Sequence, residues 1–222
     1  MRFTIKREEF LKGLLVAGRA VGNKTANPVL ANLRLELNEN GLFITGSNSD
    51  LTIKTQVPYR FNGVEIIRNF KEGGTLINAK LIMEIARKME SEEISLDVID
   101  STIATVSDNR SEYKLNCVRL EEYPDLDLDP SGTQLTLARS TFNALVSQTA
   151  FAASTKEQRP VLTAINLEAN DGLLTATATD SARMARKEVT VDQDVHFVAN
   201  VPAKMMVEVD RLLEGLDAVD IS

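Results

Sequence analysis

Two stretches of this chain share one layout, and this duplication constrains the fold more than any other feature. Residues 159–185 read as a strand, a tight turn, a second strand and a polar loop, and residues 27–53 repeat this order. The tripeptide Pro-Val-Leu begins at Pro28 and again at Pro160, which are 132 positions apart. We therefore expect a fold built from copies of one module.

Further matches support the duplication. The paired segments are two turn dipeptides, Asn40-Gly41 and Asp171-Gly172, and two loops, residues 49–51 and residues 179–181. Asn-Gly and Asp-Gly are typical of two-residue hairpin turns in which both residues have positive φ. We therefore expect a tight hairpin at each dipeptide.

Hydrophobic periodicity predicts an α+β chain. Apolar residues recur at helical spacing in residues 8–21 and alternate in residues 32–38, as in a half-buried strand. The order strand–helix–strand–strand–strand occurs twice in residues 1–124, which we expect to form a first domain. An acidic, proline-bounded linker follows at residues 125–132. The pattern restarts at residues 133–222, where one complete unit and the opening of another predict a truncated second domain.

The same patterns predict element boundaries. We expect strands to start at Pro28 and to run over residues 160–169, and a helix over residues 139–152. Asn78 is expected to cap the helix that follows it, because an Asn side chain accepts a hydrogen bond from a first-turn N–H.

Composition limits the class of protein. Of 222 residues, 43% are hydrophobic and 26% are charged, which is typical of a soluble globular chain. No apolar run reaches the length of a membrane span. Cys117 is the only cysteine, so no internal disulfide can form, and we expect a cytoplasmic protein.

The sequence offers no catalytic or metal-binding motif. His196 is the only histidine and lies in an alternating strand without a motif partner, and we expect Cys117 to be a small buried hydrophobe. Phosphate-loop, nucleophile-elbow and zinc-protease motifs are absent from the sequence. We expect no catalytic residue, no metal and no cofactor. A hydrolase or transferase with an unrecognised site is the alternative.

An acidic run in the linker resembles the start of a calcium loop. Asp125, Asp127 and Asp129 alternate there, but Pro130 and Thr136 occupy the positions where such a loop needs glycine and glutamate. A solvated linker is the better interpretation.

Basic residues recur on the helices although the net charge is −7. For any single helix, a solvated face is the simpler interpretation, but recurrence favours one shared cationic surface that holds a phosphate backbone weakly and without sequence preference. The surface lacks the base-reading side chains that a sequence-specific DNA binder needs. The cations are Lys12, Arg19, Lys80, Arg87, Arg139, Lys204 and Arg211, with Lys24 and Lys156 in matching loops.

A second candidate surface lies at the strand ends of the second domain. Leu162, Thr179, Ser181 and Met184 are either ordinary core and turn residues or the lining of a shallow apolar pocket. In the latter case such a pocket would anchor the hydrophobic side chains of a short peptide, with arginines at its rim.

Dispersed motifs, together with the duplication, resemble the bacterial sliding clamp family, the beta subunit of DNA polymerase III. These motifs are Arg2-Phe3-Thr4-Ile5, residues 27–30, residues 113–116, residues 122–126, residues 159–162 and residues 178–180. The resemblance implies an α+β DNA clamp fold of repeated β-α-β-β-β units, with antiparallel sheets outside and helices lining the inner face. It also implies a head-to-tail homodimeric ring with three domains per subunit. The third domain would be missing here, so we expect that this chain alone closes no stable ring.

The resemblance further implies a non-enzymatic processivity factor. Such a ring encircles duplex DNA, is opened by a clamp loader, and tethers the alpha subunit of DNA polymerase III and other proteins with a clamp-binding motif. Tyr113 and Leu115, on an edge strand at about residues 113–117, would contact another subunit. Some family members have glycine and histidine at the positions of Ser181 and Ala182, which affects the shape of the pocket. The implied pocket residues are Arg159, Leu162, Thr179, Ser181, Ala182, Arg183 and Met184.

Overall fold

The computed structural model describes residues 1–22, 27–126, 128, 132, 134–156 and 158–222. Contacts divide the chain into two compact units, Met1–Leu126 and Asp127–Ser222, which are described separately below as unit 1 and unit 2. Within the described residues, no helix combines the length and the apolar character needed to span a membrane.

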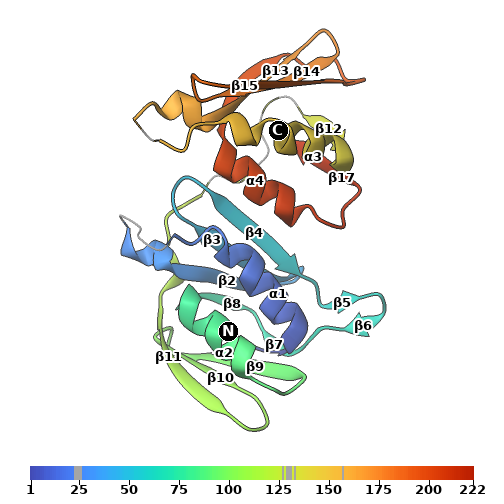
Figure 1. Cartoon of the computed structure of the whole chain (residues 1–222). Helices are drawn as coiled ribbons and strands as arrows, with labels where there is room; N and C mark the ends of the chain where they lie inside the picture. Colours follow the sequence, from blue (N-terminus) through green and yellow to red (C-terminus); the bar gives the residue numbers. More distant parts are fainter. Residues whose placement is uncertain (23–26, 127, 129–131, 133, 157) are drawn as a thin grey trace. The chain divides into compact units, whose positions relative to one another are not determined.

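Unit 1 contains both complete repeats (Figure 1). The first repeat comprises β1 (Arg2–Lys6), α1 (Arg7–Gly18), the 3-10 helix η1 (Pro28–Ala31), β2 (Asn32–Asn38), β3 (Gly41–Ser47) and β4 (Thr52–Val57). The short strands β5 (Arg60–Phe61), β6 (Val64–Glu65) and β7 (Ile67–Lys71) follow. The second repeat comprises β8 (Gly73–Asn78), α2 (Ala79–Lys88), β9 (Glu93–Ile99), β10 (Ile103–Ser107), β11 (Glu112–Val118) and the 3-10 helix η2 (Leu120–Glu122).

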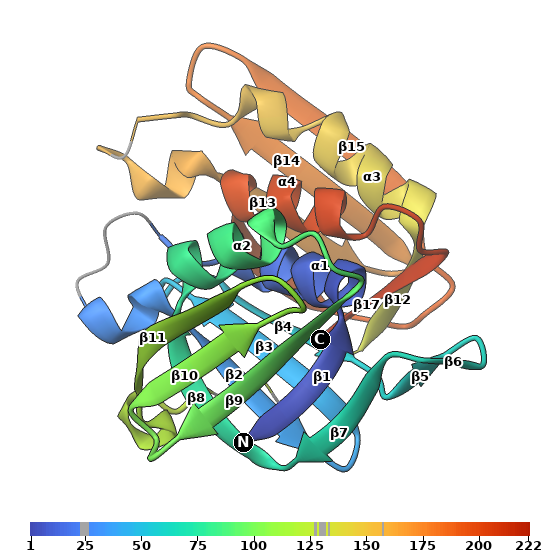
Figure 2. The same cartoon turned by 90° about the horizontal axis from the view of Figure 1, so that it is seen from below.

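The two repeats of unit 1 exchange their first strands. The nine-stranded sheet has the order β4-β3-β2-β8-β11-β10-β9-β1-β7, so β1 pairs with β9 of the second repeat and β8 pairs with β2 of the first. All pairings are antiparallel. Neither repeat can complete its sheet alone, and the two helices therefore lie next to each other on one face (Figure 2).

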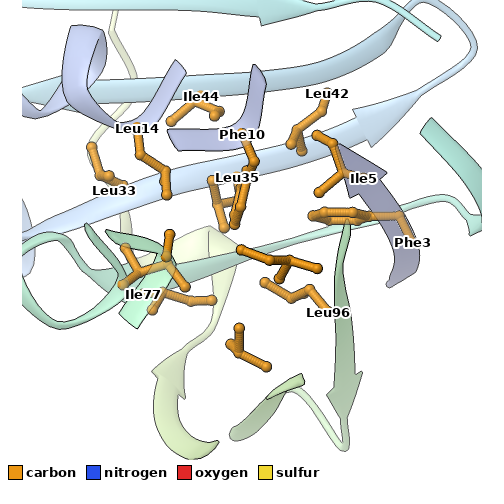
Figure 3. Close-up of a cluster of buried hydrophobic side chains, with 14 of the residues drawn as sticks. Phe3, Ile5, Phe10, Leu14, Leu33, Leu35, Leu42, Ile44, Ile77 and Leu96 are labelled. Carbon is orange, nitrogen blue, oxygen red and sulfur yellow. The ribbon is translucent and has the colours of Figure 1, made fainter. Parts of the chain in front are cut away.

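The core of unit 1 lies between the helices and the sheet. Phe10 and Leu14 of α1 are fully buried against side chains from both repeats, among them Leu35 and Leu96 (Figure 3). Each such side chain contributes about 1.5–3 kcal/mol on burial. The opposite face of the sheet has a smaller cluster, in which Tyr123 covers Leu30 and Leu76.

Local sequence accounts for the helix starts. The Asn78 side chain accepts a hydrogen bond of 3.1 Å from the backbone N–H of Leu81, which confirms the expected cap of α2. At the start of α1, Lys6 makes no side-chain cap, but Glu8 and Glu9 place negative charge beside the free N–H groups of the first turn.

Unit 2 repeats the connectivity of unit 1. Its elements are β12 (Leu135–Ala138), α3 (Arg139–Ser147), η3 (Ala150–Ala152), η4 (Pro160–Thr163), β13 (Ala164–Asn170), β14 (Leu173–Thr179), β15 (Met184–Thr190), β16 (Phe197–Pro202), α4 (Ala203–Leu212) and β17 (Ala218–Ile221). The four-stranded sheet has the order β15-β14-β13-β16, and β12 pairs with β17. The pairing of β16 with β13 corresponds to that of β8 with β2 in unit 1. Likewise, the pairing of β17 with β12 corresponds to that of β9 with β1. The described residues of unit 2 contain no counterparts of β10 and β11.

The strand register corrects the sequence alignment of the repeats. In the hairpins, Asn38 pairs with Gly41 and Asn170 pairs with Leu173, so the 132-residue spacing of the two prolines holds throughout. The expected match of residues 49–51 with 179–181 was therefore wrong by two positions, and residues 47–49 are the true counterparts. The expected match of Asn40-Gly41 with Asp171-Gly172 was wrong by one position, since residues 39–40 correspond to residues 171–172.

The two hairpin turns also differ from each other. Asp171 and Gly172 have φ of 51° and 76°, as the turn type requires. At the other turn only Gly41 has positive φ, and the N–H of Asn40 donates instead to the Asn38 side chain at 2.9 Å. The expectation of two left-handed residues at Asn40-Gly41 was wrong.

Several predicted boundaries were also wrong. The prolines that begin Pro28–Ala31 and Pro160–Thr163 start 3-10 turns rather than strands, because proline suits a first helical turn and cannot donate to a strand ladder. The helix predicted for residues 139–152 ends at Ser147 and is followed by η3. The helix predicted for residues 8–21 begins at Arg7 and ends at Gly18.

We predict that Gly46→Ala destabilises unit 1 far more than Gly13→Ala. A Cβ atom at Gly46 would lie 2.2 Å from the backbone oxygen of Ala17, whereas one at Gly13 would lie 3.0 Å from the mobile Cδ1 atom of Ile44. Urea unfolding should show a loss of about 3 kcal/mol for Gly46→Ala. The change for Gly13→Ala should stay below about 1 kcal/mol, because alanine favours the helix. Equal losses would contradict the close approach of α1 to β3.

Candidate functional site

Exposed cations lie on both helices of unit 1. Lys12 on α1 and Lys80 and Arg87 on α2 are exposed, and α1 and α2 contact each other. Arg19, just beyond α1, is also exposed. The structure thus places these four side chains on the helices or beside them, whereas Lys24 lies outside the described residues.

The cations of unit 2 are less uniform. Lys204 on α4 and Lys156 in the loop before η4 are exposed. Arg211 is exposed as well, but its Nη1 atom lies 2.6 Å from the Glu208 carboxylate, which offsets its charge. Lys204 and Lys156 are therefore the better candidates for contact with an anionic partner.

Arg139 holds α4 in place. Its Nη1 atom pairs with the Asp210 carboxylate at 2.9 Å, while Nε and Nη2 donate to the carbonyl oxygens of Leu213 and Asp210 at 3.0 and 2.8 Å. These bonds satisfy carbonyls at the C-terminal end of α4 with a positive charge. The Arg139 side chain is mostly covered, and we therefore remove it from the expected DNA-facing set.

The predicted pocket residues gather at one end of the β13–β15 sheet. Met184 begins β15 and is 69% exposed, while Val161 in η4 is 64% exposed and Leu162 is half-buried. The carbonyl oxygen of Leu162 accepts a 2.8 Å hydrogen bond from the N–H of Ser154, which connects η4 to the segment after η3. Large apolar side chains are thus exposed at this end of the sheet, and an exposed apolar patch commonly marks an interaction site.

The loop between β14 and β15 is held by its own side chains. Thr179 donates its hydroxyl to the carbonyl of Arg183 at 2.7 Å and accepts the N–H of Ser181 at 3.1 Å. Asp180 accepts the N–H groups of Ala182 and Arg183, both at 2.9 Å. Ser181 has φ of 76°, a conformation that these bonds stabilise.

The rim carries two arginines. Arg159 is exposed at the start of η4, and Arg183 places its Nε atom 3.0 Å from the Asp180 carboxylate. The backbone N–H groups of Arg183 and Ala182, and then the Arg183 charge, hold the pKa of Asp180 below its ordinary value of 3.8. The carboxylate therefore stays ionised and orients Arg183 over a wide pH range.

Unit 1 contains the same loop with different side chains. Asn48 accepts the N–H groups of Asp50 and Leu51 at 3.0 and 2.8 Å, and Ser49 has φ of 80°. Asn48 thus occupies the position of Asp180 without its charge. The sequence comparison missed this match because its register was two positions off.

The expected subunit contact lies on a partly unpaired strand. Residues 112–116 of β11 pair with β10, whereas β8 pairs only with Cys117 and Val118. Tyr113 is 39% exposed, and Leu115 is half-buried. Within the described residues, one backbone edge of this stretch is therefore available for another strand.

Among the residues that the structure describes, the titratable groups elsewhere form no catalytic arrangement. His196 lies on the surface, as predicted, where its ring nitrogens contact Asp194 and Asn170 at 2.9 and 2.8 Å. Cys117 is buried, as predicted. In the described part of the chain, no three metal-ligating side chains meet, and the expected loop residues Asp127 and Asp129 fall outside that part.

A polar hollow on unit 1 is lined by two arginines, which are both ion-paired, and by four carboxylates. Arg110 pairs with Glu90 at 2.6 Å, and Arg68 pairs with Glu93. Asp108 accepts the N–H groups of Arg110 and Ser111, which lower its pKa. These residues have structural partners and provide no free acid–base pair.

We predict that Asp180→Asn preserves the loop but changes its response to acid. Asparagine can accept the same two N–H groups, as Asn48 does, whereas Asp180→Ala loses both. A depressed carboxylate pKa adds stability above the ordinary value of 3.8, and this contribution disappears as pH falls through the folded pKa. The melting temperature of wild type should therefore exceed that of Asp180→Asn at pH 7, and the difference should close as pH falls through the lowered pKa of Asp180, which lies below 3.8. A difference that does not change with pH would refute this role.

Comparison with known proteins matches both units to one family. The N-terminal domain of the DNA polymerase III beta subunit matches residues 1–127, and the central domain of the same subunit matches residues 136–222. Curated relatives named beta sliding clamp include those of Halalkalibacterium halodurans, 34% identical, and Bacillus subtilis, 28% identical. Each match covers 100% of this chain but only 60% and 59% of the relative, respectively, so the chain spans about three fifths of their length.

Solved structures show the same relationship. The Bacillus subtilis DNA polymerase sliding clamp superposes with a TM-score of 0.95 at 27% identity, and the match covers 100% of this chain and 59% of that one. A DnaN sliding clamp from Pseudomonas aeruginosa, bound to griselimycin, gives 0.89 at 26% identity with the same coverage.

Proposed function

Because this chain belongs to the DNA polymerase III beta subunit family, we propose that it acts as a DNA polymerase processivity factor. In this proposal it forms part of a ring-shaped sliding clamp around duplex DNA. The ring tethers the alpha subunit of DNA polymerase III and other proteins that carry a clamp-binding motif, and a clamp loader opens it. It has no catalytic role of its own. The expected cytoplasmic location fits this role and rests on the single cysteine.

One observation carries the proposal: exposed cations recur on the helices of a chain whose net charge is −7. Lys12, Lys80, Arg87 and Lys204 would face the DNA, with Arg19 and Lys156 beside them. Lysine and arginine contacts to phosphates are independent of sequence, and a small number of them gives weak binding. Weak, sequence-independent contacts suit a protein that slides, since a ring is retained by encircling the DNA rather than by affinity.

The surface around Met184 supports the tethering role. It combines exposed apolar side chains with Arg159 and Arg183, and its loop is pre-shaped by internal hydrogen bonds. A pre-organised apolar site costs little entropy when a peptide docks. We propose that this surface receives the hydrophobic side chains of partner peptides.

The unpaired edge of β11 supports a subunit contact. An exposed strand edge with free N–H and C=O groups pairs readily with a strand of another chain. We propose that Tyr113 and Leu115 lie in such a contact within a homodimeric ring.

We predict that removing Lys80 and Lys204 weakens DNA binding and its dependence on salt. Each lysine that contacts a phosphate contributes about 0.9 to the slope of log affinity against log salt. The Lys80→Ala/Lys204→Ala variant should therefore reduce that slope by roughly 1 to 2 in fluorescence anisotropy with duplex DNA. Lys71→Ala, on strand β7, is the matched control. A slope unchanged by the double variant, or reduced equally by Lys71→Ala, would exclude these helices as the DNA-facing surface.

We predict that Met184→Lys weakens peptide docking. The probe is a synthetic peptide with glutamine followed by spaced leucines and a terminal phenylalanine. Met184 is exposed in this structure and would be covered by the docked peptide, so a charge at its position should weaken binding by roughly tenfold or more. Val198→Lys, at a residue that is 68% exposed on β16, is the control and should leave binding unchanged. Unchanged affinity of Met184→Lys in a calorimetric titration would remove Met184 from the site.

A further inference from the structure

Phe151 is a large exposed aromatic residue that no sequence pattern connected with the peptide surface. It lies in η3 (Ala150–Ala152) with 59% of its surface exposed. The guanidinium carbon of Arg183 lies 5.9 Å from the centroid of the Phe151 ring, within cation–π range. Phe151 therefore lies beside a rim residue of the surface around Met184.

Arg183 is held from two directions. Asp180 binds its Nε atom at 3.0 Å, and its guanidinium carbon lies over the Phe151 ring, 5.9 Å from the ring centroid. Within the described residues, Arg183 has no other ion pair, so its terminal amino groups are free to meet an anion. A guanidinium fixed in this way loses little side-chain entropy when it binds a carboxylate.

Unit 1 shows that the fold does not require this pair. The turn that carries Phe151 has an equivalent in unit 1. The N–H of Ala20 donates to the carbonyl oxygen of Ala17 at 3.1 Å, just as the N–H of Ala152 donates to that of Thr149 at 2.9 Å in unit 2. With the spacing of 132 residues, Arg19 occupies the position of Phe151.

The partner position differs as well. Leu51 stands in unit 1 where Arg183 stands in unit 2, although the two loops share three hydrogen bonds from backbone N–H groups to side chains. Neither member of the aromatic–arginine pair is therefore needed to form the turn or the loop.

The apolar residues of the 3-10 helices η1 and η4 are buried to different extents in the two units. In unit 1, Leu30 is 2% exposed because Tyr123 packs over it. Its counterpart in unit 2, Leu162, is only half-buried, and Val161 beside it is 64% exposed. Phe151, Arg183 and the less buried apolar residues Val161 and Leu162 thus occur together in unit 2.

We propose that Phe151 is a positioning residue of the peptide surface, which holds the Arg183 guanidinium so that the surface prefers a peptide with a carboxylate beside its apolar anchors. This inference rests on the proposed peptide docking. The chemistry of the occupant follows from the surface: Phe151, Val161 and Met184 supply apolar contact, and Arg159 and Arg183 supply positive charge.

The test uses two forms of one fluorescent peptide, which has glutamine, spaced leucines and a terminal phenylalanine. One form ends in a free carboxylate and the other in an amide. Wild type should bind the carboxylate form roughly two- to fivefold more tightly, the size expected of one exposed cation–π-supported arginine contact. Phe151→Ala and Phe151→Leu should lose this preference, whereas Phe151→Tyr should retain it because its ring face is similar.

Two further variants separate positioning from simple packing. Arg183→Gln should lose the preference, and the Phe151→Ala/Arg183→Gln double variant should lose no more than Arg183→Gln alone. Val198→Ala removes another exposed apolar side chain from unit 2 and should bind like wild type.

The outcomes distinguish this inference from the proposed function. If Phe151→Ala keeps the carboxylate preference, or if wild type has none, the role of Phe151 is refuted while peptide docking stands. If wild type binds neither form of the peptide, the proposed docking function fails as well.

Discussion

Strand pairing between the repeats is the constraint on which the rest of unit 1 depends. Because β1 completes the sheet at β9 and β8 completes it at β2, neither repeat can satisfy its backbone hydrogen bonds alone. The exchange places α1 against α2 and forms one core from both repeats, with Phe10 and Leu96 in the same cluster. Unit 2 uses the same exchange, in which β16 pairs with β13 and β17 with β12.

This arrangement separates two kinds of surface. The helices bury their apolar stripes on the sheet, which leaves their polar faces, with Lys12, Lys80 and Lys204, exposed to water. The strand ends of unit 2 instead expose apolar side chains beside arginines. A phosphate backbone and an apolar peptide require these different chemistries, so one module can serve both proposed partners at separate places.

Duplication also makes the functional differences easier to recognise. Where the two units share hydrogen bonds, as in the loops at Asn48 and Asp180, the shared geometry belongs to the fold. Where they differ at equivalent positions, as with Arg19 and Phe151, the fold tolerates either residue. The charge of Asp180, the Phe151 ring and the only half-buried Leu162 are therefore features of one unit, and they occur on the surface proposed to bind peptides.

The sequence by itself determined the repeated α+β module, most strands and helices, the cap at Asn78 and the positions of the helix cations, because periodicity and turn chemistry are local properties. The family resemblance in the motifs was likewise readable from the sequence and was confirmed by the matches to both domains. Only the tertiary structure decided which strands pair, because paired residues such as Phe3 and Leu96 are far apart in the sequence of unit 1. It also decided that Arg139 is committed to Asp210 and that Phe151 meets Arg183. These contacts join residues far apart in the chain, and no local pattern specifies them.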